Sequence, residues 1–266
     1  MRTRRIGLTT VSVLVVLLVS LPTLIVIPMS FTGEQSFSFP PTSWSVRWYT
    51  SFVQSEAWRS SLVFSLEVAV CVMVLTTVVG TMVAFGLRRL PARVAAWAQS
   101  LTLLPIIIPT IVTAIGVYEA FLRWHLAGSL LGFTLAESAL TLPYVVLSIG
   151  VGISRINPRL AQAAATLGCR PLEVFFKITL RLMLPSVLTA MLLAFVASLD
   201  EAVVALFLST PTTQTLPVQM YNSMLQVTDP TVAAASTILL TLVTVGGSIG
   251  LVVMPYLRRR RRAARI

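Results

Sequence analysis

Residues 62–87 read LVFSLEVAVCVMVLTTVVGTMVAFGL, and Arg88 and Arg89 follow directly. The run contains one charged residue, Glu67. It is longer than the roughly 20 apolar residues with which a helix crosses the hydrocarbon of a bilayer. A helix satisfies its own backbone polar groups in lipid, where no water can do so. The stretch therefore predicts a membrane-spanning helix that ends in basic residues.

Five further apolar runs of this kind follow one another along the 266 residues. The chain is 56% hydrophobic and 11% charged, with a mean hydropathy of +0.89, so lipid must be the solvent for most of it. Long unbroken runs favour helices over the short alternating strands of a membrane barrel. We predict an all-α polytopic membrane protein, a single transmembrane domain over 1–266 with spans at 6–29, 62–87, 97–118, 133–153, 184–208 and 232–257.

The basic residues distinguish the two sides of the membrane. All except Arg47, Arg59 and Arg123 lie in the two tails or in the connections at 88–96 and 154–183. Because Lys and Arg accumulate on the cytoplasmic side, both termini are predicted to be cytoplasmic. This topology, together with contacts between the C-terminal arginines and anionic lipid, explains the net charge of +11 better than nucleic-acid binding does.

The connection at 30–61 is rich in aromatic residues and contains Pro40 and Pro41. Aromatic side chains at this density are typical of a segment that lies in the membrane interface. Docking of an extracytoplasmic partner is the alternative interpretation. The aromatic residues concerned are Phe37, Phe39, Trp44, Trp48, Tyr49, Phe52 and Trp58.

The connection at 154–183 is too regular to be a loop. Pro158 begins a short predicted helix that Gly168 ends, and Pro171 begins a second helix with apolar residues at helical spacing. A helix–glycine–helix hairpin over about 158–181 is predicted. It would either offer its alanines to a partner or only cover the helix bundle.

Within this hairpin, Gln162-Ala163-Ala164 precedes Gly168 by the spacing Glu-Ala-Ala, three residues, Gly, and Ile178-Thr179-Leu180 follows after nine more. The pattern resembles that of the permease subunits of binding-protein-dependent ABC importers. Gln162 replaces the glutamate of the family pattern, and Arg181 replaces its proline. Without the glutamate, an ion pair that this residue makes in the family is not expected here. The prediction of the hairpin is unaffected.

The resemblance implies a role for the hairpin and a set of partners. The hairpin would be the coupling helix, with Gln162, Ala163, Ala164, Gly168 and Ile178 meeting a cytoplasmic ATPase. The implied partners are a second permease subunit that is a paralogue of this chain, two ATP-binding subunits and an extracytoplasmic solute-binding protein, in a bacterial inner membrane. ATP and Mg²⁺ would bind to the partner ATPase, because this chain has no phosphate-binding glycine loop around its only lysine, Lys177.

A narrower resemblance, to the second-permease type of the spermidine/putrescine group, rests on three segments: 198–204, 216–221 and 235–240. It implies a polyamine as the transported solute. Other solutes of the same transporter class remain alternatives, namely an opine, an amino-acid derivative, ferric ion or thiamine. A membrane-embedded enzyme and a channel are rival classes. Against the enzyme, the chain has a single histidine, and no catalytic or metal-binding set of residues is evident in the sequence.

Acidic residues inside the predicted spans are the remaining candidates for function. Asp200 and Glu201 fall near the middle of the fifth span, where a charge is costly. They predict either a carboxylate on a path for cationic amines or a polar pair that packs helices together. Glu67, Glu119 and Glu137 fall toward the outer ends of their spans, where the side chains are expected to reach water.

The predicted topology can be tested with reporter fusions at residues 40, 92, 127, 170, 220 and 266. The fusions should report outside, inside, outside, inside, outside and inside in that order, because each predicted span crosses once. Inverted results at 92 and 127 would overturn the six-span topology.

Overall fold

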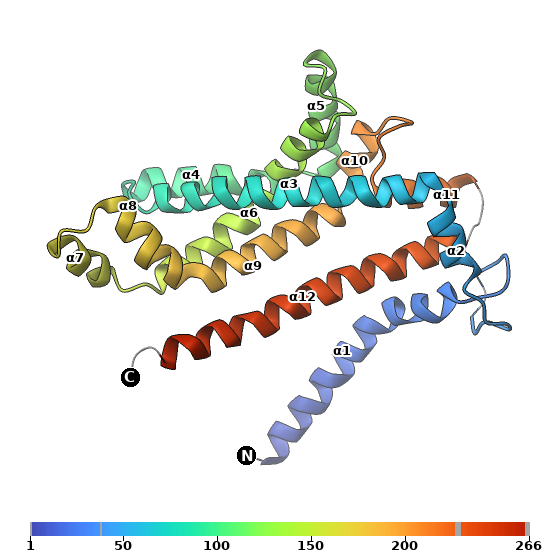
Figure 1. Cartoon of the computed structure of the whole chain (residues 1–266), viewed down its shortest axis with the longest axis horizontal. Helices are drawn as coiled ribbons and strands as arrows, with labels where there is room; N and C mark the ends of the chain where they lie inside the picture. The colour runs from blue at the N-terminus through green and yellow to red at the C-terminus, as the bar shows by residue number, and fades with distance from the viewer. Residues whose placement is uncertain (1, 38, 227–229, 264–266) are drawn as a thin grey trace. The chain divides into compact units, whose positions relative to one another are not determined.

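The computed structural model describes residues 2–37, 39–226 and 230–263 (Figure 1), and these form helices, two isolated bridges and no strand. The helices and one π-helical segment, η1, are α1 (Arg2–Ser30), α2 (Arg47–Gln54), α3 (Glu56–Leu87), α4 (Ala92–Ile107), α5 (Thr110–Arg123), α6 (Leu130–Ser154), α7 (Pro158–Thr166), α8 (Pro171–Val174), η1 (Phe175–Thr179), α9 (Leu180–Leu199), α10 (Val203–Leu208), α11 (Leu216–Gln226) and α12 (Thr231–Ala263).

The all-α fold expected from the sequence is confirmed. Among the described residues, five helical runs are long and apolar enough to cross a bilayer, and the bent pair α4 and α5 supplies a sixth if it counts as one span. Four predicted spans lie within α1, α3, α6 and α12. The other two differ from the prediction, and both differences are breaks in the helical backbone.

The predicted third span, 97–118, is not one helix. α4 ends at Ile107 and α5 begins at Thr110, and the two axes meet at 97° (Figure 1). Ile108 has an extended backbone, with φ −74° and ψ 130°, because the ring of Pro109 disfavours a helical residue before it. Pro109 also lacks the N–H that a continuing helix would use.

The predicted fifth span, 184–208, is interrupted as well. α9 ends at Leu199, and α10 begins only at Val203. At its other end the run is longer than predicted, since α8, η1 and α9 follow one another without a gap from Pro171. The second helix of the hairpin and the fifth span are therefore one helical run of 29 residues.

Contacts divide the chain into two compact units, of which the larger comprises residues 61–218 and 244–266. Its centre is the pair α6 and α9, which run antiparallel: Ser198 contacts Glu137, and Ser148 lies opposite Ser186. α3 runs parallel to α6, as the contacts of Phe64 with Phe133 and of Thr76 with Thr141 indicate.

Small residues allow these helices to approach closely. Ala190 and Ala194 on α9 are fully buried, and a Cβ built at Gly152 on α6 would lie 2.5 Å from the Cβ of Ser186. A Cβ at Gly80 on α3 would lie 2.6 Å from a methyl carbon of Val145. Close backbone approach of this kind is the usual basis of helix packing in lipid, where no hydrophobic force draws helices together.

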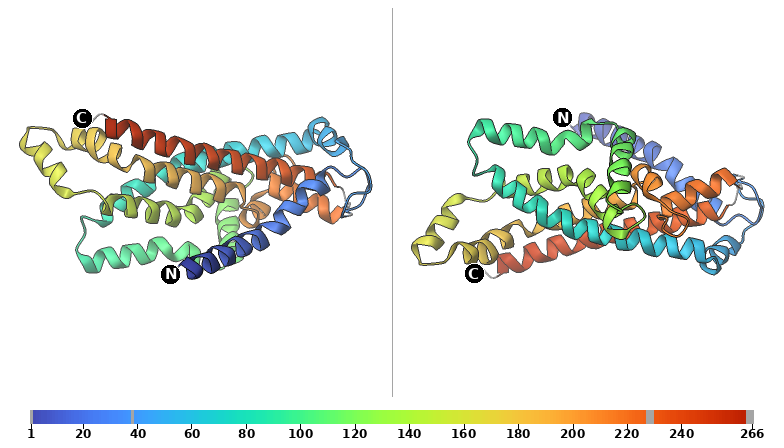
Figure 2. Two further views of the ribbon diagram at one scale, coloured as in Figure 1. Left: turned by 90° about the horizontal axis from the view of Figure 1, so that it is seen from below. Right: turned by 90° about the horizontal axis from the view of Figure 1, so that it is seen from above.

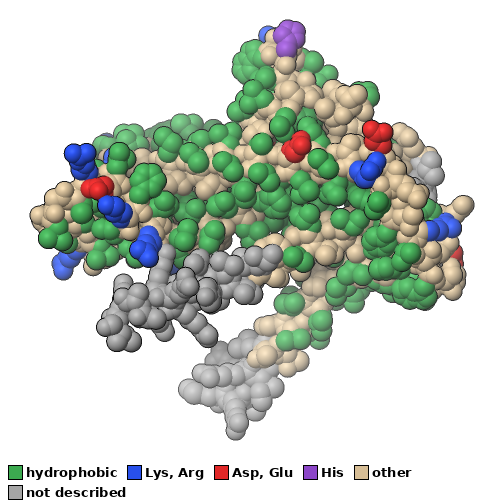
Figure 3. Space-filling view, in the orientation of Figure 1, with side chains coloured by type: hydrophobic (Ala, Val, Ile, Leu, Met, Phe, Trp, Pro, Cys, Tyr) green, Lys and Arg blue, Asp and Glu red, His purple; other side chains and the backbone are tan. Residues whose placement is uncertain are grey.

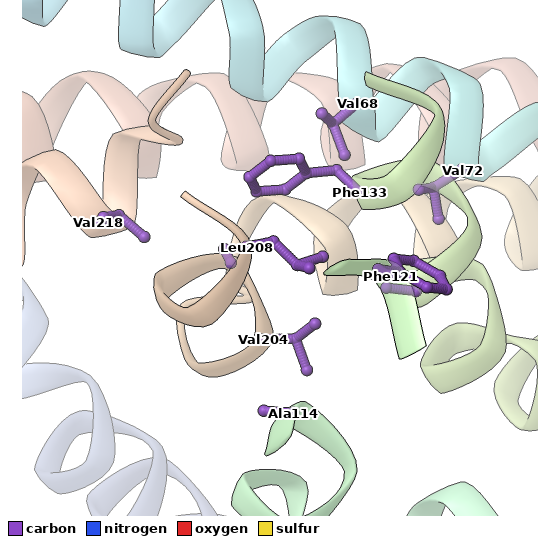
Figure 4. Packing of buried hydrophobic residues seen from close by; sticks show 10 residues of the cluster. Val68, Val72, Ala114, Phe121, Phe133, Val204, Leu208 and Val218 are labelled. Atoms are coloured by element: carbon purple, nitrogen blue, oxygen red, sulfur yellow. The ribbon is translucent and has the colours of Figure 1, made fainter. Parts of the chain in front are cut away.

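Two buried apolar clusters fill this unit. One joins α3, α5, α6 and α10, and Figure 4 shows Val204 and Leu208 of α10 lying among Ala114, Phe121 and Phe133. The other joins the far half of α6 to α9 through Val145, Ile149 and Met183, among others. Much of the visible surface is also hydrophobic, while several Lys and Arg side chains gather over α7 and α8 (Figure 3).

The smaller unit, residues 1–60 and 219–243, contains the aromatic connection. Its aromatic side chains divide between core and surface. Phe52 and Trp58 are buried against each other, with ring centroids 5.7 Å apart, whereas Trp44 is 69% exposed. The Tyr49 hydroxyl lies 2.6 Å from Ser30 Oγ and so ties α2 to the end of α1.

The close packing of α6 and α9 predicts a position-specific cost for a larger residue at Gly152. Gly152→Val should destabilise the protein by about 1–3 kcal/mol, because Ser186 leaves no room for the side chain. Gly150→Val is the matched control on the same helix, since nothing lies within 4 Å of a Cβ there. Thermal unfolding of the purified protein in detergent should show a lower midpoint for the first variant only, and equal midpoints would contradict the packing.

Candidate functional site

The hairpin at 158–181 turns at Gly168, whose φ is +85°. The Gly168 N–H donates to the carbonyl of Ala165 at 3.0 Å, and the Cys169 N–H donates to that of Ala164 at 3.1 Å. These two bonds form a Schellman motif, which closes a helix with a left-handed residue. Glycine is favoured there because a side chain would strain the backbone.

Side-chain caps fix both helices of the hairpin. Asn157 Oδ1 accepts the Arg159 N–H at 3.0 Å at the start of α7. Glu173 accepts the Arg170 N–H at 3.1 Å at the start of α8, and it also pairs with Lys177 at 2.9 Å. The exposed ion pair adds little stability by itself. Together, these contacts give the hairpin a defined shape at the end of α6 and α9 (Figure 2).

The residues expected to meet an ATPase lie on different sides of this hairpin. Gln162, Ala163 and Gly168 are exposed, whereas Ala164 is buried and Ile178 is half-buried within η1. Three large apolar side chains of the predicted hairpin are exposed: Leu167 at 84%, Leu172 at 72% and Phe176 at 61%. Large apolar side chains with this exposure outside the predicted spans are candidates for contact with a partner.

The second candidate region is the break between α9 and α10. Asp200 is exposed, and its N–H donates to the carbonyl of Val196 at 3.1 Å as α9 ends. The half-buried Glu201 uses both carboxylate oxygens on the next helix, accepting the N–H groups of Val204 at 3.2 Å and Ala205 at 3.1 Å. The two acids therefore differ in role: Glu201 caps α10, and Asp200 keeps its carboxylate on the surface.

Glu137 does not lie where the sequence analysis placed it. The prediction that its side chain reaches water is wrong, since the residue is 1% exposed in the middle of α3, α6 and α9. Its Oε2 accepts a hydrogen bond from the Ser198 hydroxyl, and among the described residues its Oε1 has no partner. Glu67 and Glu119, by contrast, are exposed.

No group of three or more metal-ligating side chains occurs in the part of the chain that the structure describes.

A family model described as the binding-protein-dependent transport system inner membrane component matches residues 76–263, which include the hairpin and the helix break. The chain belongs to this family. The resemblance read from 162–168 and 178–180 is confirmed.

Relatives and one solved structure support the assignment. The chain is 29% identical to the putrescine transport system permease protein PotI of Escherichia coli, over 82% of this chain and 80% of PotI. It is also 29% identical to the spermidine/putrescine permease protein PotC of Haemophilus influenzae, over 91% of each chain. A molybdenum transport system permease protein, ModB of Mycobacterium bovis, is 31% identical over 73% of this chain and 79% of ModB.

The fold is that of a bacterial ABC transporter involved in the import of alginate, with a TM-score of 0.71, 16% identity and 96% of each chain covered. As a member of the inner-membrane family, the protein is the permease subunit of an ABC importer and not an enzyme. ATP hydrolysis belongs to a partner chain. The rival classes of membrane enzyme and channel are thereby set aside.

Proposed function

We propose that this permease carries a polyamine such as putrescine or spermidine across the inner membrane. The observation that carries the proposal is the identity to PotI and PotC, which extends over most of each chain. The similarity to ModB, 31% identity over 73% of this chain, supports a second candidate, which is another solute of the same transporter class.

The permease acts in an assembly. Its partners are a second permease subunit, two ATP-binding subunits and an extracytoplasmic solute-binding protein, and both of its termini lie in the cytoplasm. ATP and Mg²⁺ are held by the ATP-binding subunits. The family description, which names a binding protein, supports the extracytoplasmic partner, and the arginine distribution supports the orientation.

The hairpin at 158–181 is the contact to the ATP-binding subunit. The exposed Leu167, Leu172 and Phe176 supply apolar area, and the tight turn at Gly168 lets a partner approach the backbone. From this contact the unbroken helical run 171–199 leads to Asp200. Movement of the hairpin is thus passed along α9 to the helix break, in a rocking motion of the kind that transporters use.

Asp200 is the residue on the solute path. A carboxylate that faces a path attracts an ammonium group that has left water, and Asp200 is the acid of the break whose carboxylate is exposed. Glu201, the other predicted path residue, instead satisfies the backbone of α10.

Gly168→Val tests the coupling role. The left-handed backbone costs a β-branched residue about 1–2 kcal/mol, so we expect about a tenfold fall in the ATP hydrolysis of the assembled importer. Gly168→Asn is the matched control for the turn, because asparagine tolerates this conformation. Wild-type hydrolysis by the valine variant, measured per assembled complex, would remove the hairpin from the mechanism.

Asp200→Asn tests the solute path and the solute. The amide keeps the size of the side chain and removes its charge, so uptake of radiolabelled putrescine by proteoliposomes with the whole importer should fall about tenfold or more. Glu201→Gln should impair uptake less than Asp200→Asn does, since the amide oxygen still accepts one of the two α10 N–H groups.

Two results would contradict the proposal. Normal putrescine uptake by Asp200→Asn would show that this carboxylate does not guide the solute. Absence of uptake by the wild-type importer, with ATP hydrolysis intact, would favour another solute of the class.

A further inference from the structure

The contact between Glu137 and Ser198 joins two distant parts of the larger unit. Glu137 lies on α6, and Ser198 is the penultimate residue of α9, 61 positions later. Both residues are buried, at 1% and 6% exposure. The Ser198 hydroxyl donates to Glu137 Oε2, and Asp200 follows only two residues beyond the donor.

Few other polar contacts hold the end of α9 in place. The Asp200 and Glu201 N–H groups bond to carbonyls of α9 itself, at Val196 and Ser198, so they do not fix the helix against its neighbours. The residues that face α6 nearby are small, with Ala190 and Ala194 both fully buried. Such side chains allow close packing but permit sliding, whereas a buried hydrogen bond defines one register.

A layer of buried polar groups that crosses the unit lies next to Glu137. Thr141, one turn along α6, donates to the Glu137 carbonyl at 2.9 Å, and its hydroxyl lies 3.2 Å from that of Thr76 on α3. A buried polar group in a membrane helix is costly unless it is hydrogen-bonded, and ionisable residues found there usually have a function. Here the layer links α3, α6 and α9 at the level where the fifth span is about to break.

We propose that Glu137 is a positioning residue, which accepts the Ser198 hydroxyl and thereby fixes the end of α9 and the location of Asp200 at the solute path. The inference rests on the proposed function of Asp200. Glu137 itself does not touch the solute. It sets where the carboxylate of another residue lies, and an amide oxygen at position 137 fills the same role because it also accepts a hydrogen bond.

The test compares Glu137→Ala, Ser198→Ala, their double variant and Glu137→Gln in the assembled importer in proteoliposomes. Thr134→Val is the matched control, since Thr134 is also buried on α6 but its hydroxyl bonds only to Leu130 of its own helix. The first readout is the amount of putrescine moved per ATP hydrolysed. A general loss of folding lowers the amount of assembled complex and leaves this ratio unchanged.

Ser198→Ala and Glu137→Ala should each lower the ratio about tenfold, the effect expected when a buried acceptor and its donor are parted. The double variant should fall no further, because both single changes break one contact. Glu137→Gln and Thr134→Val should keep the wild-type ratio. Ser198→Ala removes a single oxygen atom, so it reports on the contact even if Glu137→Ala fails to assemble.

A second readout needs no knowledge of the solute. In a background with Cys71→Ser and Cys169→Ser, a cysteine introduced by Asp200→Cys is labelled with a hydrophilic maleimide. Glu137→Ala and Ser198→Ala should change the labelling rate about tenfold, as the end of α9 leaves its fixed position, and Glu137→Gln should not. A labelling change without putrescine uptake by the wild type would refute the solute and retain the positioning role.

Three results would overturn the inference. One is a wild-type ratio and labelling rate in Ser198→Ala. Another is a Glu137→Gln variant as impaired as Glu137→Ala, which would assign the effect to the charge of Glu137. The third is additive losses in the double variant, which would mean that the two residues act separately.

Discussion

The structure depends on one constraint: a backbone in lipid must satisfy its own hydrogen bonds. Long helices meet this constraint through their own backbone hydrogen bonds. Wherever a helix is interrupted, other groups nearby must bond to the freed N–H and C=O groups. At the break after Leu199, the Glu201 carboxylate supplies acceptors for two N–H groups of α10, while buried side chains of α5 and α6 cover the short helix. At the bend before Thr110, proline has no N–H to satisfy.

One continuous helical run joins the second helix of the hairpin to the helix break. Pro171 begins a helical run that continues through the π-helical residues Phe175–Thr179 to Leu199. Phe175 stacks edge-on against Phe85 of α3, and small residues bring α9 close to α6. No loop interrupts the backbone between Pro171 and Leu199, which is the basis of the coupling proposed above.

Hydropathy predicted the helices and local turn chemistry predicted the hairpin, because these follow from the average polarity of long segments and from the proline and glycine residues at turns. The family was suggested by its resemblance to the spaced motif at 162–168 and 178–180. The break after Leu199 was missed for a physical reason: the hydropathy of an apolar run is the same whether or not its backbone is continuous. Ile108-Pro109 carried a signal, since a residue before proline avoids the helix. The burial of Glu137 had no such signal in the sequence near it, because its partner Ser198 lies 61 residues away along the chain. Whether Gln162, Ala163, Ala164, Gly168 and Ile178 contact an ATPase stays a prediction.

The central claim is that the fifth span is broken so as to present Asp200 to the solute. An electron cryomicroscopy structure of the assembled importer in a lipid nanodisc, with putrescine bound, tests it most directly. The account predicts a non-helical backbone at residues 200–202, with the Asp200 carboxylate facing the path between the two permease subunits. A continuous helix through these residues, or an Asp200 side chain directed toward lipid, would contradict it.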